Sequence, residues 1–183
     1  MTAKKTKKRV VSKKSPLRRK PAAVPEAGPW LVEVSYRSAR YDPAGNALAK
    51  AIKDWDPKAE VKPRVSHLYL LEGELDRKAA RQIAQDLLED PVIQASDVQP
   101  VREPKDGGSD AGVIDVWPKP GVTDVVGQTV ETGLKDFNLH GIRARCGTRY
   151  TIPDARSRNW LGDVAKNLLV NPLIHDYRIR LDR

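Results

Sequence analysis

The sequence contains an internal repeat, and no other feature constrains the fold as strongly. The segment Asn171-Pro172-Leu173-Ile174 has an altered copy, Asp90-Pro91-Val92-Ile93, 81 residues earlier. The match extends through both halves, at an offset of 82 that becomes 81 after one deleted residue. Its pairs include Val34 with Val116, Asp42 with Asp124, Gly45 with Gly127, Tyr69 with Tyr150 and Leu87 with Leu168. We therefore predict two copies of one unit of roughly 70 residues.

Size and charge fit two small units and a basic tail. Residues 1–20 hold ten Lys or Arg and no acidic residue, and the other 163 residues hold 23 basic and 24 acidic ones. Units this small are marginally stable alone, so we expect them to pack on each other. The predicted boundaries are a disordered basic tail at 1–28, a first unit at 29–101, a linker at 102–110 and a second unit at 111–183.

The tail allows two interpretations. It is either a solubilising extension or a segment that contacts RNA, DNA or an acidic partner. The single cysteine, Cys146, excludes an intramolecular disulfide and fits a reducing compartment. No apolar run is long enough for a membrane span, and no apolar segment of a secretory signal follows the basic residues. We expect a soluble, cytoplasmic protein.

Each unit is predicted to be βαβαβ. Alternating residues indicate a strand at 31–37, Asp42-Pro43 begins a helix that ends near Asp56, and 61–71, 75–89 and 92–101 form a strand, a helix and a strand. In the second unit the first helix follows Asp124, with an apolar face of Val126, Val130, Leu134 and Phe137. The later elements of that unit are a strand at 142–152, a helix with Trp160, Val164 and Leu168 on one stripe, and a last strand with Tyr177, Ile179 and Leu181. We predict an α+β fold whose helices cover one sheet face, with the units as a pseudo-two-fold pair joined by their long middle strands.

The middle strand of the second unit has the clearest alternation. Ile142 to Ile152 places every second residue, Cys146 among them, on the packed side. The other side presents Arg143, Arg145 and Arg149. These arginines are either a solvated strand face or a docking patch for carboxylates or a phosphate, to which Arg makes bidentate contacts.

Several motifs of the second unit resemble the PurS family, the small subunit of phosphoribosylformylglycinamidine synthase. They are Lys119-Pro120-Gly121-Val122 with Asp124 and Gly127, then Arg143, Arg145, Gly147 and Tyr150, and finally Asn171-Pro172-Leu173-Ile174 with Asp176-Tyr177. The resemblance spans 113–181 well, and reaches 31–101 only through the repeat. It implies a non-catalytic subunit that docks a glutaminase (PurQ-like) subunit onto an ATP-using synthetase (PurL-like) subunit in purine biosynthesis, with Arg143, Arg145, Arg149 and Asp176 binding partners.

The first unit departs from the family pattern. It has Ser38-Ala39-Arg40 in place of the Lys-Pro-Gly turn, and Ser66-His67-Leu68 in place of the Gly147 pattern. We therefore expect the first unit to have lost some partner contacts. Whether ADP or glutamine is needed for assembly is left open. The alternative function is a nucleic-acid-binding or regulatory protein that acts through its tail.

The sequence predicts no catalytic residues of its own. His67, His140 and His175 fall at unrelated places in the repeat, and no phosphate-binding loop, metal-spaced His/Cys set or nucleophile elbow is present. We therefore expect no cofactor and no metal. Cys146 is predicted to be an inert core thiol.

Overall fold

The computed structural model describes residues 28–101 and 111–181 as an α+β fold. The first half contains β1 (Trp30–Tyr36), α1 (Pro43–Trp55), β2 (Arg64–Glu72), α2 (Arg77–Ile83) and β3 (Gln94–Pro100). The second half contains β4 (Gly112–Pro118), α3 (Val125–Asp136), β5 (Arg143–Ile152), α4 (Arg158–Val164) and β6 (His175–Arg180). A 3-10 helix, Ala39–Tyr41, precedes α1, and π-helical turns, Ala84–Leu88 and Ala165–Leu169, continue α2 and α4. Apart from Gly28, the predicted tail and linker lie outside the described residues.

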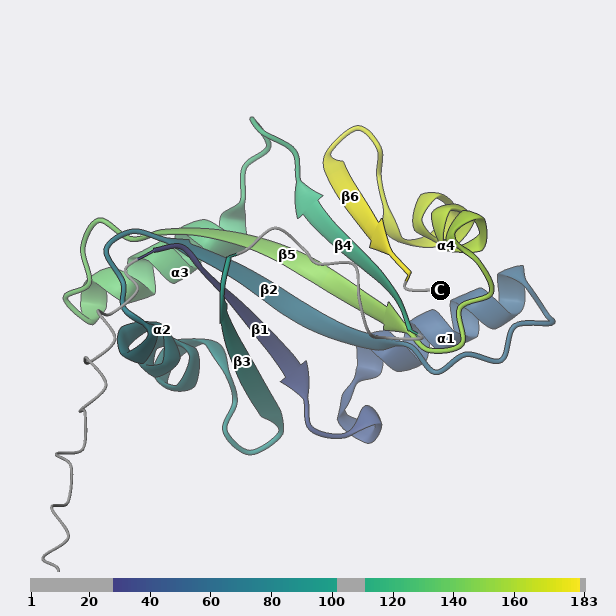
Figure 1. Ribbon diagram of the computed structural model, residues 1–183, viewed down its shortest axis with the longest axis horizontal. Coiled ribbons are helices and arrows are strands. Elements are labelled where there is room, and N and C mark those ends of the chain that lie inside the picture. Colours follow the sequence, from purple (N-terminus) through teal and green to yellow (C-terminus); the bar gives the residue numbers. More distant parts are fainter. Residues whose placement is uncertain (1–27, 102–110, 182–183) are drawn as a thin grey trace, which may run out of the picture.

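The six strands of the described part form one antiparallel sheet in the order β3-β1-β2-β5-β4-β6 (Figure 1). The halves meet at β2 and β5, which pair from Arg64 opposite Thr151 to Glu72 opposite Arg143. The pair His67 and Thr148 lies near the middle of this junction, and the two residues correspond at the sequence offset of 81. The long middle strands thus join the halves into one sheet.

The first helix of each half begins with the same set of hydrogen bonds. Asp42 accepts from the N–H of Gly45 (2.7 Å) and from a backbone N–H of β2 (2.9 Å). Asp124 accepts from the N–H of Gly127 (2.8 Å) and from a backbone N–H of β5 (2.6 Å). Each carboxylate therefore caps its helix and also fixes it to the middle strand. A Cβ atom at either glycine would come within about 2.5 Å of a neighbouring oxygen, so this close approach requires glycine.

The helices pack on one face of the sheet in two pairs, and each pair combines the halves. α3 lies beside α2, and α1 lies beside α4, at opposite ends of the sheet (Figure 1). Trp30 of the first half shares a core with Leu134 of α3. Ile114 and Leu161 of the second half share the other core with Ile52 of α1. Neither half therefore completes a hydrophobic core without a helix of the other.

The predicted apolar face of α3 is wrong at its two ends. Val126 is 55% exposed and Phe137 is 50% exposed. The buried residues of this helix are Gly127, Val130 and Leu134. Because the cap of Asp124 holds Gly127 against β5, Val126 turns toward solvent, and Phe137 follows the last helical residue. No helix within 28–101 or 111–181 is long and apolar enough to cross a membrane.

Candidate functional site

Two loops of the second half, residues 119–122 and 171–174, lie side by side. The backbone N–H of Lys119 donates to the carbonyl of Ile174 (2.9 Å), and its ammonium group donates to the carbonyl of Pro172 (2.5 Å). The first loop follows β4 and the second precedes β6, so the pairing of these two strands brings them to the same edge of the sheet (Figure 1). The fold therefore joins two of the sequence motifs into one surface.

Asn171 shapes the second of these loops. Its side-chain carbonyl accepts a hydrogen bond from the N–H of Leu173 (3.0 Å), and its backbone carbonyl accepts from the N–H groups of Ile174 and His175. Asp90 makes the matching side-chain bond in the first half, to the N–H of Val92 (2.8 Å). Local side-chain hydrogen bonding of this kind favours a turn over a continued helix.

Apolar side chains are exposed on the second of these loops and on the first turn of α3, which follows the first loop. We call them the apolar patch: Val125 (66% exposed), Val126 (55%), Leu173 (82%) and Ile174 (40%). Exposed apolar side chains that gather at one region of a surface mark an interaction site more reliably than scattered ones do.

A groove of about 390 Å³ runs beside the apolar patch on the helix face of the sheet. Val125 and Val126 line it on the α3 side, and the strands beneath contribute Tyr69 and Tyr150. Burial raises the pKa of the phenol of Tyr69 and that of Tyr150, so both remain neutral hydroxyl groups at physiological pH. The groove thus offers apolar surface with neutral hydrogen-bonding groups.

The opposite face of the sheet carries Arg145, Trp117 and Asp176. The guanidinium of Arg145 lies 5.9 Å from the centre of the Trp117 ring, and Asp176 pairs with Trp117 across β4 and β6. The indole lies against Gly147, where an added Cβ would be 2.7 Å from the ring. Gly147 is therefore required by the close approach of Trp117. Asp176 is exposed.

Arg149 is engaged inside the protein. Its guanidinium makes a bidentate contact with Asp115 (2.6 and 2.9 Å) and also contacts Glu33. Ser66 donates to Glu33 (2.7 Å), and Arg180 donates to Asp115 (2.9 Å). Burial lowers the pKa of Arg149, but the hydrogen bonds and charges of Asp115 and Glu33 outweigh it, so that the pKa is raised. The network crosses five strands and connects the two halves.

The three arginines of β5 therefore differ in exposure. Arg143 and Arg145 are exposed, as predicted, but Arg149 is not: its side chain is only 15% exposed. Alternation along β5 correctly places Arg149 on the face opposite the helices. On that face Asp115 of β4 and Glu33 of β1 bind its guanidinium and cover it. A role of Arg143, Arg145 and Asp176 in partner binding stays a prediction. Lys119, Trp117 and the apolar patch were not among the predicted site residues, although Lys119, Leu173 and Ile174 lie in the quoted motifs.

The described residues hold no group of three or more His, Cys, Asp or Glu that could bind a metal ion. Cys146 is buried, and burial together with the charge of Asp124 raises the pKa of its thiol to about 12. The thiol is thus protonated and protected, as predicted for an inert core cysteine. The arrangement provides surfaces for binding.

Comparison with known proteins gives one family match, which lies in the second half. No curated protein matches the chain. Residues 112–183, which include the two adjoining loops, the apolar patch and all three arginines of β5, match the model of the PurS family, described as phosphoribosylformylglycinamidine (FGAM) synthase.

Proposed function

We propose that this protein is a non-catalytic subunit of FGAM synthase that docks the glutaminase subunit onto the ATP-dependent synthetase subunit. The PurS match of the second half links the chain to this enzyme of purine biosynthesis. The apolar patch, formed by the loop 171–174 and the first turn of α3, is the observation that carries the docking role. Burial of exposed apolar side chains is the main favourable contribution to most protein–protein association.

We further propose that the chain is a tandem fusion of two PurS-like units related by a pseudo-two-fold axis. The matching caps of Asp42 and Asp124 support this, because each fixes the same helix to the same strand. The antiparallel pairing of His67 with Thr148 also supports it, because these two residues correspond in the repeat. A two-fold axis that relates the halves would pass between them. In this proposal the chain takes the role of a pair of separate small subunits.

The network around Arg149 favours a fused pair over two identical copies. Glu33 and Asp115 correspond at the offset of 82, and the single Arg149 contacts both carboxylates. The position that corresponds to Arg149 is Leu68, which is fully buried. Two identical units would bring two arginines to this junction. The junction instead has one arginine, which binds both carboxylates, and one buried leucine, so the two halves are not interchangeable there.

The two halves also differ at the positions of the apolar patch. Val125 and Val126 of the second half correspond to Pro43 and Ala44, which present less apolar surface. Leu173 corresponds to Val92, which is equally exposed, at 80%. The proposal therefore assigns docking mainly to the second half, and Val92 offers a matched control for Leu173.

The test is reconstitution with the purified synthetase and glutaminase subunits. The protein alone should turn over no substrate, the mixture should form FGAM from glutamine, and native mass spectrometry should find one copy of this chain per synthetase. Leu173→Asp should weaken assembly at least about 30-fold, as expected for an interface anchor, and Val92→Asp should leave it nearly unchanged.

Three results would contradict the proposal. Glutamine-dependent activity that is the same without this protein would remove the docking role. Two copies per synthetase would contradict the view that one fused chain replaces a pair. Equal effects of the Leu173 and Val92 substitutions would show that docking does not favour the second half.

A further inference from the structure

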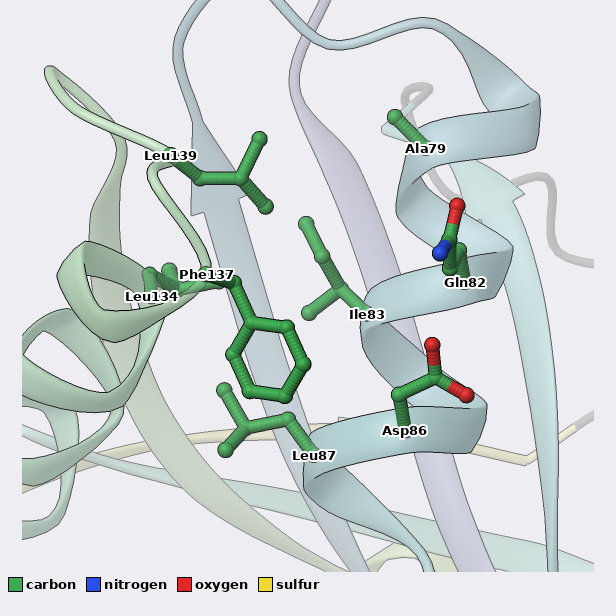
Figure 2. Close-up of a pocket in the computed structure, with 8 residues that line it drawn as sticks. All are labelled: Ala79, Gln82, Ile83, Asp86, Leu87, Leu134, Phe137 and Leu139. Atoms are coloured by element: carbon green, nitrogen blue, oxygen red, sulfur yellow. The ribbon is translucent and has the colours of Figure 1, made fainter.

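A pocket of about 150 Å³ lies between α2 of the first half and α3 of the second. Its apolar wall consists of Ala79, Ile83, Leu87, Leu134, Phe137 and Leu139 (Figure 2). Phe137 is half exposed at this site, although Ile83 and Leu134 beside it are buried. An apolar cavity of about 150 Å³ can hold a benzene-sized ring. The space is therefore suited to one aromatic side chain.

The corresponding space at the other end of the molecule is filled. Ala79 corresponds to Trp160 at the offset of 81, and both residues follow their helix caps, Asp76 and Ser157, by three positions. The indole of Trp160 lies 6.5 Å from that of Trp55, the residue that corresponds to Phe137. The filled site therefore shows which group fits the open one.

A hydrogen bond completes the filled site. The indole N–H of Trp160 donates to the carboxylate of Asp56 (3.0 Å) at the end of α1. The open pocket has polar groups at its α2 side, the amide of Gln82 and the carboxylate of Asp86 (Figure 2). Asp86 lines this pocket and offers a carboxylate acceptor to an indole N–H, although from the α2 side and not from the facing helix, which supplies Asp56 at the filled site.

The surface next to the open pocket is basic. Arg77, Lys78 and Arg81 are exposed on α2 and line an adjoining hollow together with Gln82. The positions of α4 that correspond to Lys78 and Arg81 are Asn159 and Gly162, so the filled end lacks two of these charges. The open pocket and the basic surface thus occur together on one helix. This charge favours a partner with acidic side chains.

We propose that the pocket receives a tryptophan side chain from an acidic segment of a partner protein. This inference rests on the proposed function, so the partner is the synthetase or the glutaminase subunit. The chain itself has no Phe, Trp or Tyr in residues 1–27, 102–110 or 182–183, and these segments therefore contain no ring for the pocket. The partner's tryptophan would complete the α2 and α3 pair as Trp160 completes the α1 and α4 pair.

The first arm of the test uses indole as the probe. Indole added to the full chain should shift the NMR signals of Phe137, the only Phe in the sequence, and of the Leu139 methyl groups in a saturable way. Ala79→Trp should abolish these shifts, because its own indole occupies the space. Ala79→Leu serves as a smaller filling should the tryptophan variant fail to fold. Absence of saturable shifts in the wild type would overturn the proposal.

The second arm measures assembly with the synthetase and glutaminase subunits. Ala79→Trp should weaken the complex at least about 30-fold, the loss expected when an interface anchor is displaced. Trp160→Phe, at the corresponding position, should leave assembly unchanged. Replacing Arg77, Lys78 and Arg81 by Gln should weaken the complex and reduce its dependence on salt.

The outcomes separate the two proposals. A complex that the Leu173→Asp variant weakens and the Ala79→Trp variant does not would overturn the pocket proposal and leave the docking function standing. Failure of the wild type to form any complex would end both. Self-association of the wild type that Ala79→Trp removes would identify a second copy as the occupant, and would also overturn the proposal.

Discussion

The two helix pairs of this protein occupy corresponding places in the sheet, but only one of them has the space between its helices filled by a side chain. At the α1 and α4 end, Trp160 fills the space between the helices and bonds to Asp56. At the α2 and α3 end, Ala79 leaves a pocket and Phe137 stays half exposed. Corresponding positions therefore carry a packed indole in one half and leave an open pocket in the other. The substitutions below test this asymmetry, from the largest expected effect to the smallest.

The largest effect is expected from Arg149→Leu, which places at position 149 the residue type found at the corresponding position 68. The substitution leaves Asp115, 8% exposed, and the partly buried Glu33 without their common cation. Breaking a buried ion pair by removing one partner costs about 3–5 kcal/mol. Urea unfolding should show this loss. Arg145→Ala is the exposed control and should change stability by less than about 0.5 kcal/mol. A loss below about 1 kcal/mol for Arg149→Leu would show that the network does not hold the halves together.

Trp160→Ala should have the next largest effect, because it would leave a space beside α4 that resembles the pocket beside α2. Truncation of a buried aromatic residue costs about 3–5 kcal/mol, and the partial exposure of Trp160 favours the lower end. Thermal or urea unfolding measures the loss. Arg158→Ala, an exposed position on the same helix, is the control. If Trp160→Ala unfolds like the wild type, Trp160 does not complete its helix pair.

Cys146→Val should have a smaller effect, since Val65 occupies the corresponding position in the first half. Swaps of similar volume in a core usually cost less than about 1.5 kcal/mol. In the wild type, a thiol pKa of about 12 and burial predict that a thiol reagent modifies Cys146 only upon unfolding. Rapid labelling of the native protein at neutral pH would contradict the assignment of this thiol to the core.

The smallest effect concerns the pH dependence of the filled site. The hydrogen bond from Trp160, with contributions from Lys58 and Arg156, holds the pKa of Asp56 below its ordinary value. A lowered pKa stabilises the fold above the unfolded-state value, and this stabilisation is lost as the pH falls through the folded-state value. Trp160→Phe should therefore be less stable than the wild type at neutral pH, and the difference should shrink in acid.

The Asp56 side chain is partly exposed, at 18%, so solvent screening limits this contribution. An NMR titration of its carboxyl group gives the direct measurement, with the pKa rising in the Trp160→Phe variant. An unchanged pKa of Asp56 would show that the indole N–H does not bind the carboxylate in solution.

Much of the local structure could be predicted from the sequence. The helix that Asp42-Pro43 begins, the turn at Asn171-Pro172 and the alternating strand from Ile142 to Ile152 depend on neighbouring residues alone. Capping, proline geometry and period-two alternation act over a few positions, so they can be read directly. The burial of Cys146 followed from the same alternation.

The candidate site was predicted only in part, because its parts come from distant segments. The motif loops were visible in the sequence, but their contact through Lys119 depends on the pairing of β4 with β6. Alternation placed Arg149 on the side opposite the core. It could not indicate that Glu33 and Asp115 lie on the strands around it.

The order of strands and helices within each half could be predicted from local sequence patterns alone. Only the tertiary structure decided that the first helices pack across the halves, with Leu134 in one core and Ile52 in the other. The physical reason is that local hydrogen bonds and side-chain periodicity specify an element and its buried side, whereas the partner of that side depends on register and packing across the whole sheet. That packing places the small side chain of Ala79 beside an open pocket and the indole of Trp160 in the corresponding space.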